Sequence, residues 1–353
     1  MSGAISEGPG VVVLAAFRPN PDLFRMQLES IRAQTRRDFR CLVGADGDQE
    51  EVRRLTATIV GEDPRFEVIG WDNNVGFYLN FERLLMAVPE DVAWVGLSDQ
   101  DDRWHEDKLR LLVPLLDNFG LATGQSCVVA WPANEVIVKR TNRRVVTAAD
   151  LLIENQVTGS TSVFRRDLLT LALPFPRWRT VTQLHDHWLG LCAVARDGYT
   201  VDDSVVQDYI QHGENLVGEH ERRHPRSLLG LWRLITRLAD EYEGAHDPIS
   251  CARACQAVSF GWRREMARTL TDRLEGGGPH VNAVSRLILR PGARTAGRVL
   301  RHAWRSPNVR PSVAATFVAG TPGEVFLPHG ARVPRRPSVA YHAPCQEPEH
   351  REN

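Results

Sequence analysis

Three carboxylates stand close together in the sequence, at Asp99, Asp101 and Asp102, directly after the apolar run 92–97. Hard divalent cations such as Mg²⁺ and Mn²⁺ favour oxygen ligands, and they usually take one or two protein carboxylates together with phosphate oxygens of a substrate. Asp99 and Asp101 would face the same side if the strand stays extended. The cluster therefore predicts a Mg²⁺ or Mn²⁺ site for a phosphorylated ligand, with capping of the next helix by Asp99 or Asp102 as the alternative.

Other predicted strands also end in polar residues. These residues are Arg18, Asp46, Asp48, Asn73 and Asn74. Ligands of open parallel sheets bind at the carboxyl ends of the strands, so we expect these side chains to line one crevice. Asp46 could accept hydrogen bonds from a base or ribose, although its Asp-Gly sequence is also common turn chemistry. Asn80, in the next predicted helix, would continue the same wall.

Later segments supply three further candidates. Gly159 and Ser160 lie in a hydroxyl-rich stretch that suits close approach of a sugar or phosphate, and equally a glycine-containing strand turn. Asp186 is flanked by two histidines and followed by a tryptophan, which can alter the proton affinity of a carboxylate; a helix N-cap is the competing interpretation. His212 follows a predicted strand and could bind a metal or a diphosphate, although a lone histidine is more often structural.

The elements that must position these residues alternate along the first hundred residues. An apolar run without polar alternation, such as 11–17, is typical of a strand covered on both faces. Asn20-Pro21 predicts an N-cap and first helical position. The remaining predicted strands are 40–45, 66–71, 92–97, 127–131, 136–138, 157–164 and 205–211, and the remaining helices are 50–60, 78–87 and 186–197. This alternation predicts a doubly wound α/β sheet, with mixed strand directions in its later part.

Length and composition suggest how the chain is divided. Its 353 residues correspond to roughly two domains. We expect a disordered amino terminus over 1–9, an α/β domain over 10–218, a helical region over 219–308 and a weakly ordered, proline-rich tail over 309–353. Pro291 is expected to divide the helical segment around it into two helices.

Charge and cysteine usage narrow the class of protein. A net charge of −1 gives no global signal for nucleic acid. Six scattered cysteines without a signal-peptide pattern predict reduced thiols in a cytoplasmic protein, and no apolar run reaches the roughly 18 residues that span a bilayer. Arginines recur every three or four residues within 284–305 without an acidic residue. This pattern predicts peripheral contact with the inner face of the plasma membrane, or else a solvated face or a subunit contact in a homo-oligomer.

Taken in order, the motifs resemble those of the inverting glycosyltransferases of family 2, which have the GT-A fold. The resemblance runs from about Val11 to Gly218. Its motifs are Ala45–Asp48, Asn74–Gly76 with Asn80, Ser98–Asp102 with Trp104 and Lys108, Val157–Thr161, His185–Trp188 and Tyr209–Gly218. The later motifs are most similar to those of rhamnosyltransferases that build bacterial surface polysaccharides, including the cell wall. The resemblance implies a nucleotide-diphosphate sugar donor, dTDP-rhamnose first and a UDP-hexose otherwise, and a hydroxyl of a glycan or lipid-linked molecule as acceptor.

The resemblance also implies roles for the candidate residues. Asp186 would be the catalytic base. The metal and diphosphate would be held by Asp99, Asp101 and His212. The donor-binding residues would be Arg18, Asp46, Asn74, Asn80, Asp99, Gly159 and Ser160. The Gln-x-x-Arg-Trp signature of the processive synthases is absent after Gln211, so transfer of one or a few sugars is expected. The rival hypothesis is a catalytically silent scaffold that still binds a sugar nucleotide, because fold does not guarantee activity.

Overall fold

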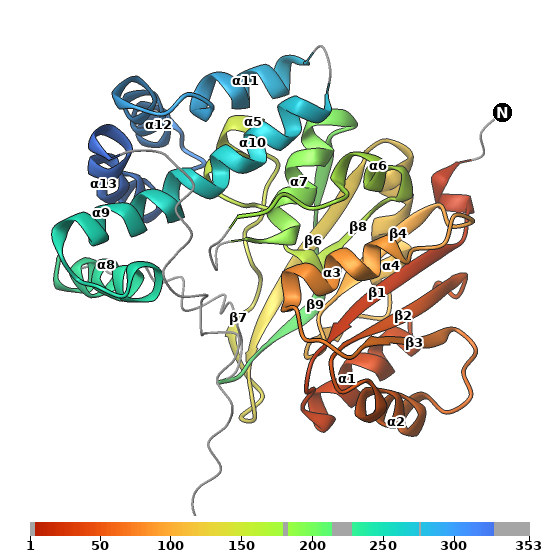
Figure 1. Cartoon of the computed structure of the whole chain (residues 1–353). Coiled ribbons are helices and arrows are strands. Elements are labelled where there is room, and N and C mark those ends of the chain that lie inside the picture. The colour runs from red at the N-terminus through yellow and green to blue at the C-terminus, as the bar shows by residue number, and fades with distance from the viewer. Residues whose placement is uncertain (1–3, 179–182, 214–227, 275–276, 328–353) are drawn as a thin grey trace, which may run out of the picture.

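The computed structural model describes residues 4–178, 183–213, 228–274 and 277–327 (Figure 1). One mixed sheet has helices on both faces, and a group of carboxyl-terminal helices lies beside it. The strands are β1 Gly10–Ala16, β2 Phe39–Asp46, β3 Phe66–Trp71, β4 Trp94–Ser98, β5 Arg103–Trp104, β6 Leu121–Ala130, β7 Glu135–Val138, β8 Ser162–Arg165 and β9 Tyr199–Gln211. The helices are α1 Pro21–Arg32, α2 Gln49–Val60, α3 Phe77–Met86, α4 Lys108–Leu112, α5 Ala148–Ile153, α6 Leu169–Ala172, α7 His185–Arg196, α8 Leu228–Glu243, α9 Pro248–Gln256, α10 Trp262–Arg273, α11 Pro279–Ile288, α12 Ala293–Arg305 and α13 Pro311–Phe326.

The sheet has the strand order β3-β2-β1-β4-β8-β6-β9-β5, and β7 pairs with β6. The first four strands of this order are parallel to one another, whereas β8 runs antiparallel to both β4 and β6. The carboxyl ends of β1, β2, β3 and β4 therefore share one edge of the sheet. The predicted fold class, a doubly wound sheet with mixed directions and helices around it, is confirmed.

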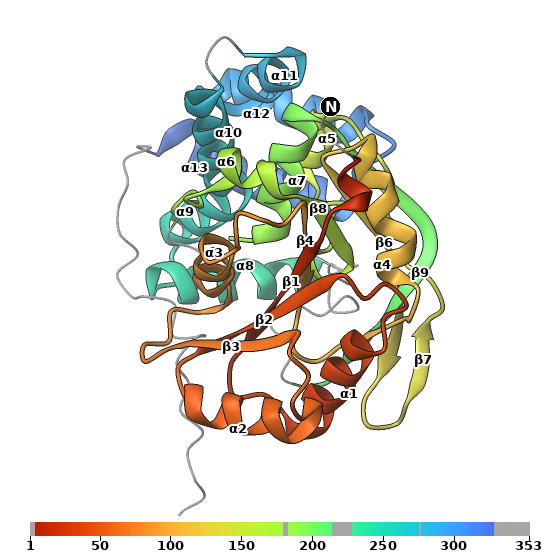
Figure 2. The same cartoon turned by 90° about the vertical axis from the view of Figure 1, so that its right-hand side faces the viewer.

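Apolar side chains on both faces of β1 explain why the sheet is covered on both sides. Val11 and Val13 belong to a core shared with α3, α5, α7 and the carboxyl-terminal helices. Val12 and Leu14 point into a second core, which α1, α2 and α4 complete on the opposite face (Figure 2). All four valine and leucine side chains are inaccessible to solvent, as an uninterrupted apolar strand predicts.

The first hundred residues follow the predicted elements closely. Asn20 caps α1 by accepting hydrogen bonds from the backbone N–H groups of Asp22 and Leu23, and Pro21 occupies the first helical position. The strand predicted over 157–164 begins only at Ser162. The residues before it form a 3₁₀ turn, because the carbonyl of Thr158 accepts hydrogen bonds from the hydroxyl groups of Thr161 and Ser162.

The expectations for the two ends need correction. The tail was expected to be weakly ordered from residue 309, but residues 311–326 form α13. Phe317 on α13 is fully buried and packs edge-on against Phe260, with ring centroids 5.1 Å apart. At the amino terminus, Ile5–Glu7 form a 3₁₀ turn that Ser6 attaches to Asp117 through hydrogen bonds of 2.9 and 2.6 Å. Residues 1–3 and 328–353 lie outside the described residues.

The carboxyl-terminal helical region agrees with the prediction around Pro291, since α11 ends before it and α12 begins after it. Residues 214–227, which contain the predicted boundary at 218 and the end of the Tyr209–Gly218 motif, lie outside the described residues. Among the helices that the structure describes, none combines the length and the apolarity needed to cross a membrane.

Candidate active site

The three clustered carboxylates have different surroundings. β4 ends at Ser98 and β5 begins at Arg103, so the cluster lies in a loop at the carboxyl edge, residues 99–102, which we call the aspartate loop. Asp102 is fully buried and accepts hydrogen bonds from Gln207 Nε2 at 3.0 Å and from the backbone N–H of Ile210 at 3.2 Å. Asp102 therefore attaches this loop to β9. The capping alternative is wrong for Asp99 and Asp102, because α4 begins after Asp107.

Asp101 and His212 meet although they are far apart in the sequence. His212 Nε2 lies 2.8 Å from Asp101 Oδ2, and both side chains are largely shielded from solvent. β9 brings His212 to the loop because β5 pairs antiparallel with β9 immediately after the aspartates. One carboxylate and one imidazole thus lie side by side at the carboxyl edge of the sheet.

Asp99 is half-buried and close to two other carboxylates. Burial raises the pKa of its carboxyl group to about 7, and the negative charges of Asp101 and Asp186 add to the rise. The buried ammonium group of Lys108 acts in the opposite direction. The site therefore concentrates negative charge, which favours a bound cation.

Asp186 lies in the first turn of α7 and faces the loop before β8. Its Oδ1 accepts a hydrogen bond from Asn155 Nδ2 at 3.0 Å, and its Oδ2 accepts one from the backbone N–H of Gly159 at 3.3 Å. Leu184 holds the N-cap position of α7, so Asp186 is not the helix cap. The backbone N–H of His187 also donates to Oδ1, at 2.6 Å, so three donors fix the orientation of a carboxylate that remains partly exposed.

Gly159 and Ser160 contribute to the same place through their backbone and hydroxyl groups. A β-carbon at Gly159 would lie 2.6 Å from His185 Nε2, so this close approach requires glycine. Ser160 Oγ accepts a hydrogen bond from Gln207 Nε2 at 2.8 Å. His185 is itself buried and stacked on Phe81 with ring centroids 3.9 Å apart, and burial lowers its pKa to about 4. The imidazole of His185 is therefore neutral near pH 7.

Lys108 is a buried cation that belongs to a motif noted in the sequence but was not predicted as a site residue. Its Nζ lies 3.3 Å from the centroid of the Trp104 ring and donates hydrogen bonds to the carbonyl of Ser160 and, at 3.2 Å, to Gln207 Oε1. Burial lowers the pKa of this ammonium well below its ordinary range, and the charges of Asp102 and Asp99 oppose the change. Lys108 thus links β9 with the turn that precedes β8, and it lies near the carboxylates of the aspartate loop.

We expect Lys108→Met to lower the free energy of unfolding by about 1–3 kcal/mol, because an acceptor that loses its buried donor is left unsatisfied. Urea denaturation followed by circular dichroism measures this change. Arg110→Met is the matched control, since Arg110 lies on the same helix but pairs with Asp107 at the exposed surface. Equal stability of the Lys108 variant and the wild-type protein would show that the buried contacts add nothing to the fold.

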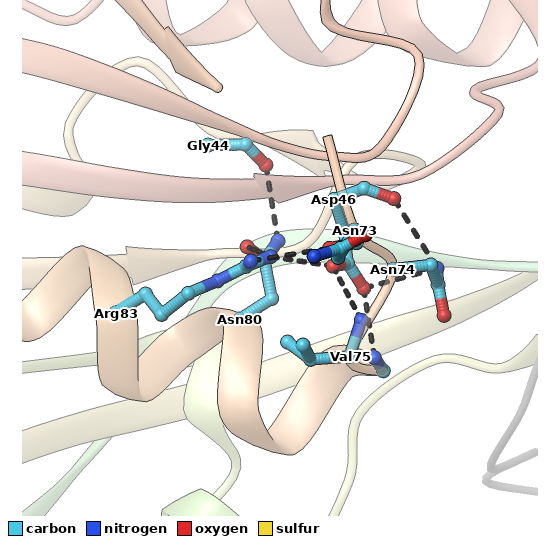
Figure 3. Close-up of polar contacts among 8 residues, drawn as sticks. Gly44, Asp46, Asn73, Asn74, Val75, Asn80 and Arg83 are labelled. Atoms are coloured by element: carbon cyan, nitrogen blue, oxygen red, sulfur yellow. Dashed lines mark hydrogen bonds and ion pairs between the residues drawn. The ribbon is translucent and has the colours of Figure 1, made fainter. Parts of the chain in front are cut away.

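A second group of candidate residues surrounds Asp46 at the end of β2 (Figure 3). The Asp46 carboxylate is buried and accepts hydrogen bonds from the backbone N–H groups of Val75 at 2.8 Å and Gly76 at 2.9 Å. Asn74 Nδ2 donates to it at 3.1 Å, and Arg83 forms an ion pair with it. Asp46 thus organises the loop between β3 and α3. Its contacts extend beyond those of an ordinary Asp-Gly turn.

Two atoms of this network lack a hydrogen-bond partner among the described residues. Asn74 Oδ1 and Arg83 Nε are buried and have no hydrogen-bond partner among the described residues, and buried polar atoms are usually paired. Arg83 was not predicted from the sequence; it lies one helical turn after Asn80, whose Oδ1 it contacts at 3.1 Å. Asn80 Nδ2 in turn donates to the carbonyl of Gly44 at 3.0 Å. The three-residue spacing between Asn80 and Arg83 on one helix is the signal that could have identified Arg83.

Arg18 is exposed at the end of β1 and has a left-handed backbone conformation, with φ of 42°. The neighbouring Phe17 is held on both sides by Gln100, whose Oε1 accepts from the Phe17 N–H at 2.8 Å and whose Nε2 donates to the Phe17 carbonyl at 3.2 Å. Gln100 therefore joins the β1 loop to the aspartate loop. The guanidinium of Arg18 lies over the Phe17 ring, 5.4 Å from its centroid.

The donor set for a metal is small. Within the described ranges, no group of three or more His, Cys, Asp or Glu side chains could hold a metal ion. Asp101 and His212 nevertheless lie together, and magnesium is commonly bound by one or two protein ligands plus the phosphates of its substrate. The residues present therefore fit a cation that shares its coordination with a diphosphate.

Residues 12–169 match the family model described as Glycosyl transferase family 2. The match covers the carboxyl edge of β1, β2, β3 and β4, including the Asp46 network and the aspartate loop. This part of the chain is therefore similar to a glycosyltransferase domain of family 2. The resemblance read from the sequence is therefore supported over these residues, whereas the rhamnosyl specificity is a separate question.

Individual proteins show more distant similarity. The chain is 29% identical over 115 residues to the "Uncharacterized protein y4gI" of Sinorhizobium fredii (strain NBRC 101917 / NGR234), covering 32% of this chain and only 12% of that protein. S. aureus TarS 1–349 in complex with UDP-GlcNAc is 14% identical, with a TM-score of 0.49 and coverage of 89% of this chain and 91% of that one. The mannosyltransferase PcManGT from Pyrobaculum calidifontis, in complex with GDP-Man and Mn²⁺, is 15% identical, with a TM-score of 0.47 and coverage of 90% and 87%.

Proposed function

We propose that the chain transfers a sugar from a nucleotide-diphosphate donor to a hydroxyl group of a glycan or lipid-linked acceptor, with inversion at the anomeric carbon. The observation that carries this proposal is the position of Asp186. Its carboxylate is held by Asn155 and Gly159 and lies close enough to Asp99 for its charge to raise the Asp99 pKa. A base for the acceptor and the site for the diphosphate are therefore adjacent, within a domain of the glycosyltransferase class.

The loop that Asp46 organises supplies the wall for the nucleotide. Asp46 is buried and engaged with the protein, so we propose that it acts by holding the loop in place. Asn74 Oδ1 and Arg83 Nε would make the contacts to the base and ribose, with Asn80 fixing Arg83. Arg18, at the adjacent end of β1, would meet the phosphates as a charged and exposed donor.

The diphosphate would lie at the aspartate loop. Asp101 and His212, with Asp99 beside them, would hold Mg²⁺ or Mn²⁺, and such a cation neutralises the charge that develops on a leaving diphosphate. Gly159 and Ser160 would form the opposite side, where the absence of a side chain at Gly159 lets the His185 ring pack closely against the turn that would face the sugar. Lys108 would keep this turn against the loop.

Asp186 would take the proton of the attacking hydroxyl group. The acceptor oxygen forms a bond to the anomeric carbon while the bond from that carbon to the diphosphate oxygen breaks, and the proton moves to Asp186. One base and one displacement reverse the configuration at the anomeric carbon. General-base assistance of this kind typically contributes about 10²–10⁴-fold to the rate.

The donor sugar is proposed from the motifs alone. The later motifs of the resemblance are most similar to those of rhamnosyltransferases, so dTDP-rhamnose is the first choice and a UDP-hexose the second. The acceptor would then belong to surface polysaccharide or cell-wall synthesis.

The purified chain is expected to release nucleoside diphosphate from one donor of a panel when Mg²⁺ or Mn²⁺ and an acceptor are present. A coupled assay for nucleoside diphosphate measures the release, and a thermal-shift screen of the same donors measures binding, since a ligand of the native state stabilises it. Binding without release across the panel would instead support the silent sugar-nucleotide-binding scaffold. If the chain neither bound nor cleaved any donor of the panel, both the transferase and the scaffold hypotheses would be contradicted.

A further inference from the structure

The carboxyl-terminal helices form a pocket that the proposed transfer reaction does not use. It lies between α5, α11 and α12, which are neighbours in both views (Figures 1 and 2). The pocket has a volume of about 460 Å³ and is lined by Arg286 from α11 and by Arg298, Arg301 and Arg305 from α12. The side chains of four arginines therefore line one open hollow.

The positive charge of this arginine pocket is not neutralised nearby. In the part of the chain that the structure describes, none of its four arginines forms an ion pair with a carboxylate. The adjacent Asp150 is already engaged, because it accepts hydrogen bonds from Asn308 at 3.0 Å and contacts His302 Nε2 at 2.8 Å. The sequence between Glu275 and Glu324 contains no acidic residue. The pocket is therefore strongly attractive to an anion.

The arginines are held in position by the packing of α12. Thr295, Ala296, Val299 and Ala303 are buried on one side of this helix, which directs the arginine row to the opposite side. Arg298 also donates a hydrogen bond of 2.8 Å to Thr295 Oγ1.

Arg286 on α11 is held in the same way, because its Nε donates to the carbonyl of Asn282 at 3.1 Å. Leu287 and two alanines supply an apolar floor to the pocket. Two of the four guanidinium groups thus have a fixed orientation before any ligand binds.

We propose that the arginine pocket binds the phosphate group of an organic phosphate. Planar guanidinium groups match the geometry of phosphate oxygens and bind them in pairs of hydrogen bonds, and two helices supply such groups from two directions. The phosphate can belong to a soluble phosphorylated compound or to the headgroup of an anionic phospholipid. Trp304, on the same helix and 84% exposed, suits the second source, since tryptophan favours membrane interfaces. This site is separate from the donor site and does not depend on the proposed transfer.

The test uses the full chain in EDTA, so that no divalent cation brings a phosphate to the aspartate loop. One arm titrates sodium pyrophosphate by calorimetry, and the other measures sedimentation with phosphatidylcholine vesicles with and without phosphatidylglycerol. The pocket variant is Arg298→Gln with Arg301→Gln. The control is Arg290→Gln with Arg294→Gln, which removes the same charge from α12 and the segment just before it, outside the pocket lining.

Binding of pyrophosphate or of the anionic vesicles is expected to be at least about tenfold weaker in the pocket variant and nearly unchanged in the control, because hydrogen bonds to charged groups are the strong ones. The arm that responds identifies the source of the phosphate. Arg298→Lys with Arg301→Lys retains the charge and should still weaken binding. Absence of binding to both probes, equal loss in the pocket and control variants, or equally tight binding of polyglutamate would overturn the proposal.

Discussion

Replacing Asp186 by asparagine is expected to lower the turnover number of sugar transfer by about 10²–10⁴-fold, because an amide cannot accept the proton of the attacking hydroxyl. The size and shape of the side chain are preserved, and its oxygen can still accept a hydrogen bond from Asn155. Donor binding does not require the base, so the Michaelis constant for the donor should change little. Steady-state kinetics with the preferred donor separates the two parameters.

The matched control for this substitution is Asp197→Asn. Asp197 follows the last residue of the same helix, α7, and lies 3.4 Å from the guanidinium of Arg196, away from the aspartate loop. Its variant should turn over at nearly the wild-type rate. If Asp186→Asn kept near-normal turnover, the base would have to be another group, and the proposed direction of attack would be wrong.

Local patterns were sufficient to predict the amino-terminal half of the sheet. An uninterrupted apolar run such as β1 has few alternatives to a buried parallel strand, and Asn20-Pro21 specifies a helix start through two independent effects. The placement of the polar residues along one edge followed from topology, because parallel strands have their carboxyl ends at the same edge. The apolar run and the helix start depend only on residues that are neighbours in the sequence, which explains why β1 and α1 could be predicted.

Contacts between distant segments could not be predicted in this way. Asp99, Asp101 and Asp102 follow the same strand, yet Asp102 is buried only because Gln207 and the Ile210 N–H come from β9, about a hundred residues later. Composition likewise suggested a weakly ordered tail, whereas α13 is stabilised by burial of Phe317 against the helix region around Phe260. Tertiary burial overrides a weak local preference in both cases.

Replacing Asp101 by asparagine is the second substitution with a large expected effect. It removes the negative charge next to His212 while leaving a side chain of the same shape, so the pair loses its best oxygen ligand for a hard cation. Loss of one preorganised electrostatic contact to a developing charge typically costs about 10²–10³-fold in turnover. Titration of activity with Mn²⁺ should also require a higher concentration of the ion.

Asp102→Asn distinguishes metal binding from a structural effect of the same loop. Asp102 is buried and bonded to β9, so its variant should unfold at lower urea concentration while keeping the wild-type concentration of Mn²⁺ for half-maximal activity. Asp101→Asn should show the reverse pattern, with near-normal stability and a changed metal requirement, because the Asp101 side chain is partly exposed. An unchanged Mn²⁺ requirement in Asp101→Asn would mean that Asp101 does not bind the cation. The aspartate loop would then contribute only through Asp99 and through its negative charge.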